Sequence, residues 1–343
     1  MSVNYLLKGS FMTILVTGAT GYIGSHTVVE LINRGYETVL VDNLANSDVS
    51  VLDKIEKITG KRPRFYQLDV AILENAEKIF RENKIDAVIH FAGLKAVGES
   101  CKIPSLYYYN NIASATAITE AASRHGCFKV IFSSSATVYG EPVRVPITED
   151  FELHTSNPYG TTKLLIENIY RDIYHWDNRW NFTLLRYFNP IGAHESGLIG
   201  DDPNGIPNNL MPYIARVASG DLERLSVFGN DYPTRDGTGV RDYIHVVDLA
   251  LGHVAALEKM TESGVHTFNL GTGKGYSVLE IVEAFERVNN VKIPYVITER
   301  RSGDIPECYA NPEKAERELC WKAERGIEDM CRSVWKFIEN TKK

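Results

Sequence analysis

The chain has 343 residues, a length at which two lobes are more common than one compact core. Hydrophobic residues make up 44% and charged residues 24% of it, which excludes a disordered or fibrous protein. The formal net charge of -7 argues against a broad nucleic-acid-binding surface, and the apolar runs are strand-sized, too short to span a bilayer.

Residues 1–11 carry no recognisable targeting signal and are predicted to be a poorly ordered N-terminal extension. From Met12 onward, strand-like apolar runs alternate with helix-length segments. This alternation is typical of a parallel sheet with helices on both faces, so the predicted fold class is α/β, a Rossmann-type doubly wound parallel sheet. We predict strands at residues 13–17, 37–41, 64–68, 86–91, 129–133 and 181–186, and helices at 23–34, 71–83, 105–125 and 158–177.

Glycine, asparagine and proline become more frequent after Asn189, which indicates a change of architecture. We therefore predict a first domain over residues 12–190 and a smaller C-terminal α/β lobe over 191–343. Part of residues 236–260 is expected to pack back on the first domain.

A glycine-rich turn follows the first strand, with Gly18, Gly21 and Gly24 spaced as GxxGxxG. Gly18 suits the sharp turn, Gly21 lets the backbone approach a pyrophosphate, and Gly24 lets the next helix pack against the sheet. Asp42 ends the second strand, where an acid accepts the ribose hydroxyls of a dinucleotide and repels a 2′-phosphate. The pattern favours NAD over NADP. Asp42 as a plain turn residue is the alternative. Asp69-Val70, at the end of the third strand, is expected to contact the adenine.

Tyr159 and Lys163 form a second motif, although a Tyr-x-x-x-Lys pair also arises by chance in a chain of this composition. Asn157 and Pro158 are good helix-starting residues, so the pair is expected on one helix face next to the strand that ends in serines 133–135. A tyrosine acting as a base needs a pKa lowered from about 10 to near 7. One cation near 4 Å contributes about 4 kcal/mol in that direction. The alternative is an exposed helix pair.

The chain resembles the extended short-chain dehydrogenase/reductase family. The resemblance rests on the glycine turn, on Ser-Ser-Ser-Ala-Thr-Val-Tyr-Gly at 133–140 and on Tyr-Gly-Thr-Thr-Lys at 159–163. Longer stretches resemble its members that epimerise UDP-sugars at C4, namely residues 90–100, 185–190, 206–213, 228–234 and 236–245. The resemblance implies an NAD-dependent isomerase that interconverts UDP-glucose and UDP-galactose. The sugar would be oxidised at C4, the keto sugar would rotate, and the hydride would return to its other face. The first domain would bind NAD and the second lobe the UDP-sugar.

The resemblance also implies roles for individual residues. Tyr159 would be the general base, Ser135 the hydroxyl that bridges it to the sugar, and Lys163 the cation that holds the nicotinamide ribose. The residues expected to contact NAD are Gly18, Gly21, Tyr22, Ile23, Gly24, Asp42, Asn43, Asn46, Ser47, Asp69, Val70, Phe91, Ala92, Gly93, Lys95, Asn110, Ser133, Tyr159, Lys163, Tyr187 and Phe188. Those expected to contact the UDP-sugar are Lys95, Ser135, Tyr159, Asn189, Asn208, Asn209, Leu210, Phe228, Arg241, Arg301, Asp304 and Cys308.

Within this second set, Arg241 and Arg301 would face the diphosphate, Asp304 the uridine ribose and Phe228 the uracil. By resemblance, Cys308 borders the sugar pocket, where a small residue leaves space for an N-acetyl group at C2. We therefore also expect activity on UDP-GlcNAc and UDP-GalNAc. A small buried thiol without a selecting role is the alternative, and a register shift onto Tyr309 would reverse the inference.

Three rival functions remain open. A nucleotide-sugar 4,6-dehydratase needs an Asp-Glu pair where this chain has Ala136 and Thr137. An epimerase of a UDP-uronate or UDP-pentose differs only in the sugar C6 group. A non-enzymatic NAD-sensing protein would not need Tyr159 together with Lys163.

The expected partner is the UDP-sugar, with neither nucleic acid nor membrane. The five cysteines lack a CxxC pair, so no metal is expected, and the reducing cytoplasm is the expected compartment. A homodimer is expected, with tyrosines 107–109 contributing to packing and the dimer surface.

Overall fold

A computed structural model describes residues 12–203, 205, 207, 209–259, 261–301 and 303–342, so the expectation for residues 1–11 lies outside the described part of the chain. These described residues form a seven-stranded sheet in the order β10-β6-β5-β4-β1-β2-β3, with every neighbouring pair parallel. The strands are β1 (Thr13–Thr17), β2 (Glu37–Asp42), β3 (Arg64–Gln67), β4 (Ala87–His90), β5 (Lys129–Ser135), β6 (Asn181–Tyr187) and β10 (Gly264–Leu270). The predicted α/β fold class with a parallel sheet is confirmed.

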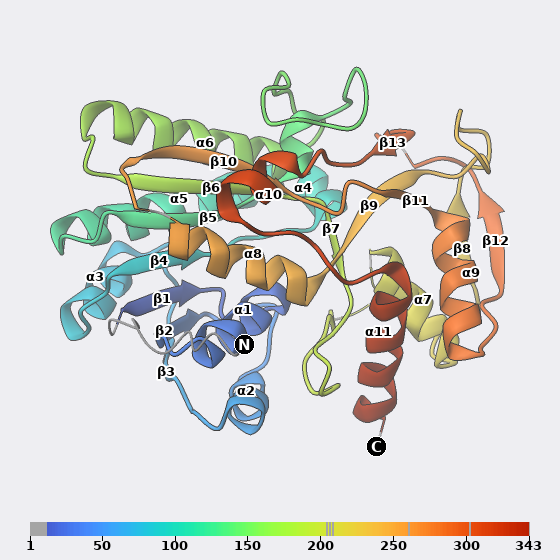
Figure 1. Ribbon diagram of the computed structural model, residues 1–343, viewed down its shortest axis with the longest axis horizontal. Coiled ribbons are helices and arrows are strands. Elements are labelled where there is room, and N and C mark those ends of the chain that lie inside the picture. The colour runs from blue at the N-terminus through green and yellow to red at the C-terminus, as the bar shows by residue number, and fades with distance from the viewer. Residues whose placement is uncertain are drawn as a thin grey trace, which may run out of the picture.

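Both faces of this large sheet are buried, because the side chains of each strand alternate between two apolar clusters. Ile14 and Val16 of β1 pack with one set of helices, whereas Leu15 packs with the other. The helices of the first set are α1 (Tyr22–Asn33), α2 (Val51–Thr59) and α8 (Val246–Lys259). Those of the second are α3 (Leu73–Glu82), α5 (Pro104–Arg124) and α6 (Pro158–Trp176), and the short α4 (Val97–Lys102) packs on α5 and α6. The result is the three-layer arrangement seen in Figure 1.

The six strands predicted from the sequence are all present, but the sequence did not reveal β10. This strand lies in the region predicted as the second lobe, and it pairs with β6 over its whole length. Its sequence, Gly-Val-His-Thr-Phe-Asn-Leu, mixes polar and apolar residues and lacks the buried appearance of the central strands. An edge strand of this kind can be identified from its pairing with a neighbouring strand, because its own sequence lacks the continuous apolar run of a central strand.

The smaller lobe lies on the right in Figure 1 and has its own apolar core. Met211 of α7, Phe285 of α9 and Met330 of α11 are buried together there. The lobe comprises β7 (Asn189–Ile191), α7 (Leu210–Ala218), β8 (Leu225–Phe228), β9 (Val240–His245), β11 (Gly275–Ser277), α9 (Val278–Asn289), β12 (Tyr295–Thr298), β13 (Glu307–Cys308) and α11 (Ile327–Thr341). β9 pairs with β7, β11 and β13, and β8 pairs with β12.

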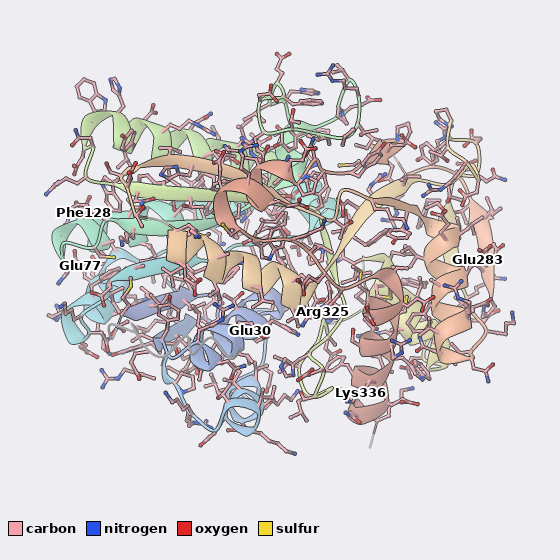
Figure 2. All side chains as sticks on the ribbon, viewed as in Figure 1. Glu30, Glu77, Phe128, Glu283, Arg325 and Lys336 are labelled. Carbon is pink, nitrogen blue, oxygen red and sulfur yellow. The ribbon has the colours of Figure 1, made fainter. Side chains whose placement is uncertain are left out.

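The chain returns from the smaller lobe to the large sheet at α8, which packs against α1. Asp248 at the start of α8 accepts hydrogen bonds from the backbone N–H groups of Glu324 and Arg325 at 3.1 and 2.8 Å, and it also pairs with the Arg325 side chain. Figure 2 shows Arg325 at that end of α8, between the two lobes. A further helix, α10 (Glu313–Leu319), packs on α8 and β10. The region after residue 190 is thus divided between the lobes.

Among the described residues, the helices lack the combination of length and apolar character that crossing a membrane requires.

Candidate active site

The glycine turn between β1 and α1 brings backbone atoms unusually close together. Gly18 has a φ of +65°, and a Cβ atom there would lie 2.9 Å from the backbone nitrogen of Ala92. A Cβ at Gly24 would lie 2.2 Å from the carbonyl oxygen of Gly18, so only glycine lets the helix approach this closely. Gly21 immediately precedes α1, whose first N–H groups lack intrahelical partners. This turn fits the pyrophosphate of a dinucleotide.

Asp42 ends β2 beside the glycine turn, and its carboxylate accepts hydrogen bonds from two loops. Oδ2 accepts from the backbone N–H of Thr20 at 3.2 Å. Oδ1 accepts from Leu44 N–H at 2.9 Å and from the Ser47 hydroxyl at 3.2 Å. These contacts are the ones expected if Asp42 were a plain turn residue, which is the alternative stated from the sequence. A carboxylate has about four acceptor positions, so Asp42 also retains capacity for ribose hydroxyls.

The other residues predicted to contact the cofactor lie in the first turn of α1 or at the carboxyl ends of the strands, where ligands bind in sheets of this type. They are Tyr22 and Ile23 in α1, Asn43, Asn46 and Ser47 after β2, Asp69 and Val70 after β3, Phe91, Ala92 and Gly93 after β4, Ser133 in β5, and Tyr187 and Phe188 at the end of β6. Asn110 lies in α5, where its side chain donates to Asn111 Oδ1 at 3.1 Å. Topology therefore gathers most of this set at one edge.

Helix α6 begins with the residues that its sequence indicates. Asn157 caps the helix by accepting a hydrogen bond from Gly160 N–H at 2.8 Å, and Pro158 occupies the first position. The Tyr159 backbone N–H donates to the hydroxyl of Ser100 at 3.2 Å. One turn later, the ammonium nitrogen Nζ of Lys163 donates to the carbonyl oxygen of Ser133 at 2.6 Å. The tyrosine and the lysine are thus held against the end of β5.

Burial shifts the pKa values of this pair in opposite directions. It raises the pKa of Tyr159 to about 12, against a smaller lowering by the hydrogen bond to Ser135. It lowers the pKa of Lys163 to about 7, because the charged amine loses solvation. Protein groups alone therefore keep Tyr159 protonated at neutral pH. A base at this position needs a further positive charge beside the ring to lower the pKa of Tyr159.

Ser135 ends β5 and precedes the 3₁₀ turn η1 (Ala136–Tyr139). Its Oγ accepts hydrogen bonds from the backbone N–H and the hydroxyl of Thr137 at 3.2 and 3.0 Å. Ala136 and Thr137 occupy the positions at which a 4,6-dehydratase would need two acids. Neither side chain can exchange a proton near neutral pH.

The residues predicted to bind the UDP part fall into two groups in the smaller lobe. Arg241 of β9 and Cys308 of β13 are register partners in neighbouring strands. The Arg301 guanidinium carbon lies 4.0 Å from the ring centroid of Phe228, and the Asp304 N–H donates to the Arg301 carbonyl at 3.3 Å. The Phe228 ring therefore limits the freedom of the Arg301 side chain.

The remaining predicted substrate residues lie around the segment that joins the lobes. Asn189 begins β7, Asn209 precedes α7, and Leu210 is its first residue. Lys95 Nζ lies 3.9 Å from Asp201 Oδ1. Asn208 lies outside the described residues.

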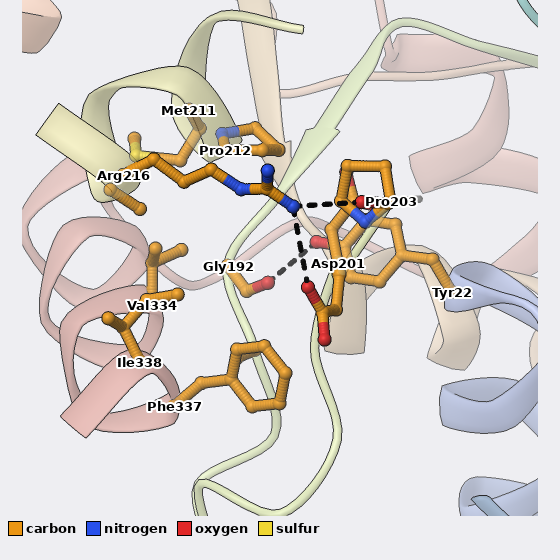
Figure 3. A pocket seen from close by; sticks show the side chains of 13 residues that line it. Tyr22, Gly192, Asp201, Pro203, Met211, Pro212, Arg216, Val334, Phe337 and Ile338 are labelled. Atoms are coloured by element: carbon orange, nitrogen blue, oxygen red, sulfur yellow. Dashed lines mark hydrogen bonds and ion pairs between the residues drawn. The ribbon is translucent and has the colours of Figure 1, made fainter. Parts of the chain in front are cut away.

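A small cavity lies where the two lobes meet, beside the first turn of α1 (Figure 3). Tyr22 crosses the junction and donates its hydroxyl to the carbonyl of Gly192 at 2.6 Å. Asp201, Arg216 and Phe337 also line this space, whose volume is about 20 Å³. That volume accommodates about one water molecule. The cavity is therefore too small for a sugar nucleotide, and Tyr22 acts there as a bridge between the lobes.

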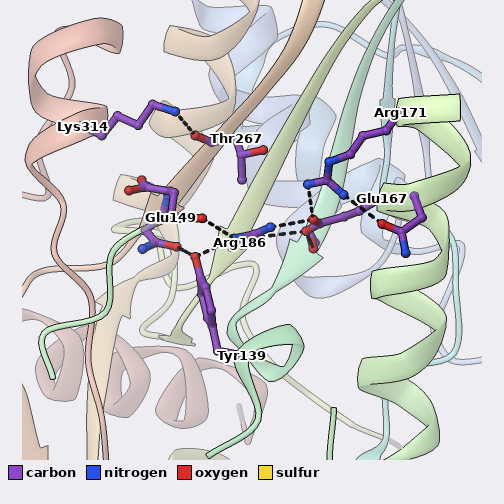
Figure 4. A network of polar contacts seen from close by, with 10 residues as sticks. Tyr139, Glu149, Glu167, Arg171, Arg186, Thr267 and Lys314 are labelled. Atoms are coloured by element: carbon purple, nitrogen blue, oxygen red, sulfur yellow. Dashed lines mark hydrogen bonds and ion pairs between the residues drawn. The ribbon is translucent and has the colours of Figure 1, made fainter. Parts of the chain in front are cut away.

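A buried polar cluster behind the active site was not identified from the sequence. Glu167 of α6 and Arg186 of β6 form an ion pair with N–O distances of 2.7 and 3.0 Å, and the Arg186 guanidinium also donates to the Tyr139 hydroxyl at 2.8 Å (Figure 4). Two signals in the chain point to it. Glu167 follows Lys163 by four residues on the same helix, and Arg186 is a charge inside an apolar strand.

A parallel sheet, a glycine turn and a Tyr/Lys pair at the strand ends are the features of the short-chain dehydrogenase/reductase class. In agreement, residues 15–334 match the family model described as GDP-mannose 4,6 dehydratase.

Similarity to individual proteins is closer still. The chain is 61% identical to the UDP-glucose 4-epimerase of Bacillus subtilis over 327 residues, covering 95% of this chain and 96% of that protein. It is 57% identical to the UDP-glucose 4-epimerase of Haemophilus influenzae over 334 residues, covering 97% and 99%. The crystal structure of the Bifidobacterium longum UDP-glucose 4-epimerase in complex with NAD+ and UDP superposes with a TM-score of 0.94 at 53% identity, covering 96% of this chain and 99% of that chain. The chain belongs to the UDP-glucose 4-epimerase family.

Proposed function

We propose that this protein interconverts UDP-glucose and UDP-galactose, with NAD held in the first domain. The observation that carries the proposal is the position of Tyr159 and Lys163 against the end of β5, with Lys163 donating to the Ser133 carbonyl at 2.6 Å. The family relationship supports the same substrate, because relatives more than 50% identical over nearly the whole chain are named UDP-glucose 4-epimerases.

The chain's residues suit NAD in three places. The glycine turn offers helix N–H groups to the pyrophosphate, Asp42 offers acceptors to the adenosine ribose, and Lys163 would hold the nicotinamide ribose. When bound there, NAD would supply the hydride acceptor for oxidation at sugar C4 and the hydride for the return.

The chain's own task is to move one proton at the sugar 4-oxygen. Tyr159 takes this proton as general base and gives it back at the end of the cycle. Ser135 contributes the hydroxyl that bridges the sugar oxygen to Tyr159. Burial raises the pKa of Tyr159 to about 12. The tyrosine can therefore act as a base near neutral pH only when positive charge beside it lowers this pKa. Lys163, whose pKa is about 7 in the buried site, supplies part of that charge when protonated.

We also propose activity on UDP-GlcNAc and UDP-GalNAc, supported by the orientation of the strand around Cys308. Cys308 is buried in a cluster with Phe188 and Val138, and Val138 lies in the turn that follows the end of β5. A Cβ at Gly275 would lie 3.0 Å from the Tyr309 ring, which places that ring on β11, away from the cluster. The small cysteine rather than the tyrosine therefore faces the side of Ser135.

A homodimer is part of the proposal. α5 and α6 pack against each other, and both carry apolar side chains exposed to solvent. Leu106 and Tyr109 on α5 are 50% and 72% exposed, and Leu165 on α6 is 37% exposed. A second copy of this chain is the occupant that we propose for this face. We propose the cytoplasm as the compartment, since all five cysteines are free thiols.

The test is incubation of the purified protein with UDP-galactose, followed by a coupled assay for UDP-glucose and identification of the bound nucleotide. Conversion without added NAD, together with release of NAD on denaturation, is the expected result. Turnover of only a UDP-uronate or UDP-pentose would transfer the proposal to those sugars. Bound NAD without any turnover would favour an NAD-sensing protein.

A further inference from the structure

Two side chains of helix α6, Lys163 and Glu167, make hydrogen bonds to the end of β5, and Glu167 lies behind the proposed active site. Tyr159, Lys163 and Glu167 are spaced by four residues, so they share one face of the helix. Lys163 donates to Ser133 and Glu167 accepts from Ser134, whereas Tyr159 is close enough to Ser135 for the serine to lower its pKa. The last of them, Glu167, has no task in the proton transfer described above.

The carboxylate of Glu167 is completely buried and is held by two neighbouring strands at once. Ser134 Oγ of β5 donates to Glu167 Oε1 at 2.6 Å. Arg186 of β6 donates through Nε to the same oxygen at 3.0 Å and through Nη2 to Oε2 at 2.7 Å. Ser134 and Arg186 are register partners in the sheet, so the carboxylate meets both from one direction. Figure 4 shows the fork of Arg186 aimed at Glu167.

The environment of Glu167 stabilises the charged form of its carboxylate. Burial acts to raise the pKa of Glu167, but the hydrogen bonds and the charge of Arg186 outweigh it, and the net pKa is lowered. Arg171 adds a further hydrogen bond to Oε2 at 2.9 Å. A buried carboxylate of this kind resists displacement, because leaving its cation would strand an uncompensated charge. The position of α6 along β5 is therefore fixed at Glu167.

We propose that Glu167, held by Ser134 and Arg186, is a positioning residue that sets the distance between Tyr159 and Ser135. Two helical turns of α6 connect Glu167 to Tyr159, so a displacement at one is carried to the other. Ser135 acts to lower the pKa of Tyr159, and this effect would weaken if the helix moved away from β5. The inference deepens the proposed function and rests on it.

Ser134→Ala is the least disruptive substitution that tests the positioning role of Glu167, because it removes one hydroxyl and leaves the Glu167–Arg186 ion pair in place. Ser114→Ala is the matched control, because Ser114 is also buried and its hydroxyl donates only to the backbone carbonyl of Asn111 within its own helix α5. Both variants are studied as the protein with its nucleotide bound. We measure kcat and KM for UDP-galactose and the thermal midpoint of each.

A second readout follows the tyrosine directly. Tyrosinate absorbance is titrated against pH for each variant, and the curve of the same variant carrying Tyr159→Phe is subtracted. We expect Ser134→Ala to lower kcat by about tenfold with KM unchanged, a smaller loss than the roughly 10²-fold that a 1 Å misplacement can cost. The titration midpoint of Tyr159 should rise, while Ser114→Ala should change neither quantity.

Combining Ser134→Ala with Glu167→Gln shows whether the serine acts through the glutamate, because the joint loss in kcat should then be smaller than the product of the two single losses. If Glu167→Gln does not fold, Ser134→Ala decides alone. Equal kcat and equal midpoints in Ser134→Ala and Ser114→Ala would overturn the inference, as would a rise in KM at constant kcat. An inactive wild type would refute the proposed function instead, and the tyrosinate titration would still test the positioning role.

Discussion

The ammonium nitrogen of Lys163 lies 2.6 Å from the carbonyl oxygen of Ser133 and 3.2 Å from its hydroxyl. This contact joins a helix to the end of the strand that precedes it in sequence, and it places a titratable amine in the buried interior beside Tyr159. The chemistry proposed for this protein depends on that placement, and the first two predictions follow from it.

Tyr159→Phe should retain the fold and the bound NAD but lose turnover, because phenylalanine can neither take nor return the proton. General acid–base groups contribute about 10²–10⁴-fold to the rate, and we expect a loss of that size in kcat for UDP-galactose. Nucleotide content after denaturation is the control. Activity within a few-fold of wild type would remove Tyr159 from the role of base.

Lys163 makes the free energy of unfolding depend on pH. Burial lowers its pKa to about 7 in the folded protein, whereas the unfolded chain keeps the ordinary value near 10.5. Between these values the unfolded state binds one more proton, so stability rises with pH. Relative to Lys163→Met, the nucleotide-free wild type should become more stable from pH 7 to pH 10. Urea unfolding at both pH values measures this, and a constant difference would show that Lys163 titrates normally in the fold.

Asp42→Ala should purify with less NAD than wild type, because the ribose hydroxyls lose their acceptor. Asp42→Asn separates this effect from the turn contacts, since its amide oxygen still accepts from Leu44 N–H. We expect both variants to lose nucleotide, as measured by absorbance after denaturation. Full retention in both would leave Asp42 as a turn residue only.

Cys308→Tyr should suppress activity on UDP-GlcNAc while sparing UDP-galactose, because the ring would fill the space beside the sugar C2. Steric exclusion can exceed the roughly 1–3 kcal/mol that a missing methylene is worth. Cys308→Ala keeps the space and serves as the control that retains both activities. The proposal fails if wild type shows no N-acetyl activity at high enzyme concentration.

Tyr109→Glu should convert a dimer into monomers, because it introduces a charge into the exposed apolar face of α5. Tyr295→Glu is the matched control, since Tyr295 lies on β12 in the other lobe and is 45% exposed. Sedimentation velocity distinguishes the two states. A wild type that is already monomeric would contradict the proposed homodimer.

The sequence predicted best those parts of the site that consist of short local motifs at the ends of parallel strands. The glycine turn, Asp42 and the Asn157–Lys163 helix start are short segments whose spacing implies their geometry, and parallel topology then brings their ends together. The pKa of Tyr159 could not be foreseen, since burial is a property of the packed whole and acts against the lowering that the motif suggests.

The features that the sequence did not predict depend on contacts between residues far apart in the chain. Glu167 meets Arg186 only after two strands have aligned in register, and β10 is recognisable only beside β6. The sequence favoured Cys308 but could not exclude a register shift onto Tyr309, whereas in the structure Cys308 is buried with Val138 and the Tyr309 ring lies against Gly275.

The late arrival of β10 has a consequence for how the protein is made. β6 is buried at all seven of its positions, and one of its two backbone edges stays unpaired until residues 264–270 exist. A nascent chain that has emerged only as far as the smaller lobe therefore presents an open, apolar strand edge, the kind that recruits other chains. The large sheet is complete only after β7, α7, β8 and β9 of the smaller lobe have been made. Expression of residues 12–190 alone should consequently yield aggregates rather than a small dinucleotide-binding protein.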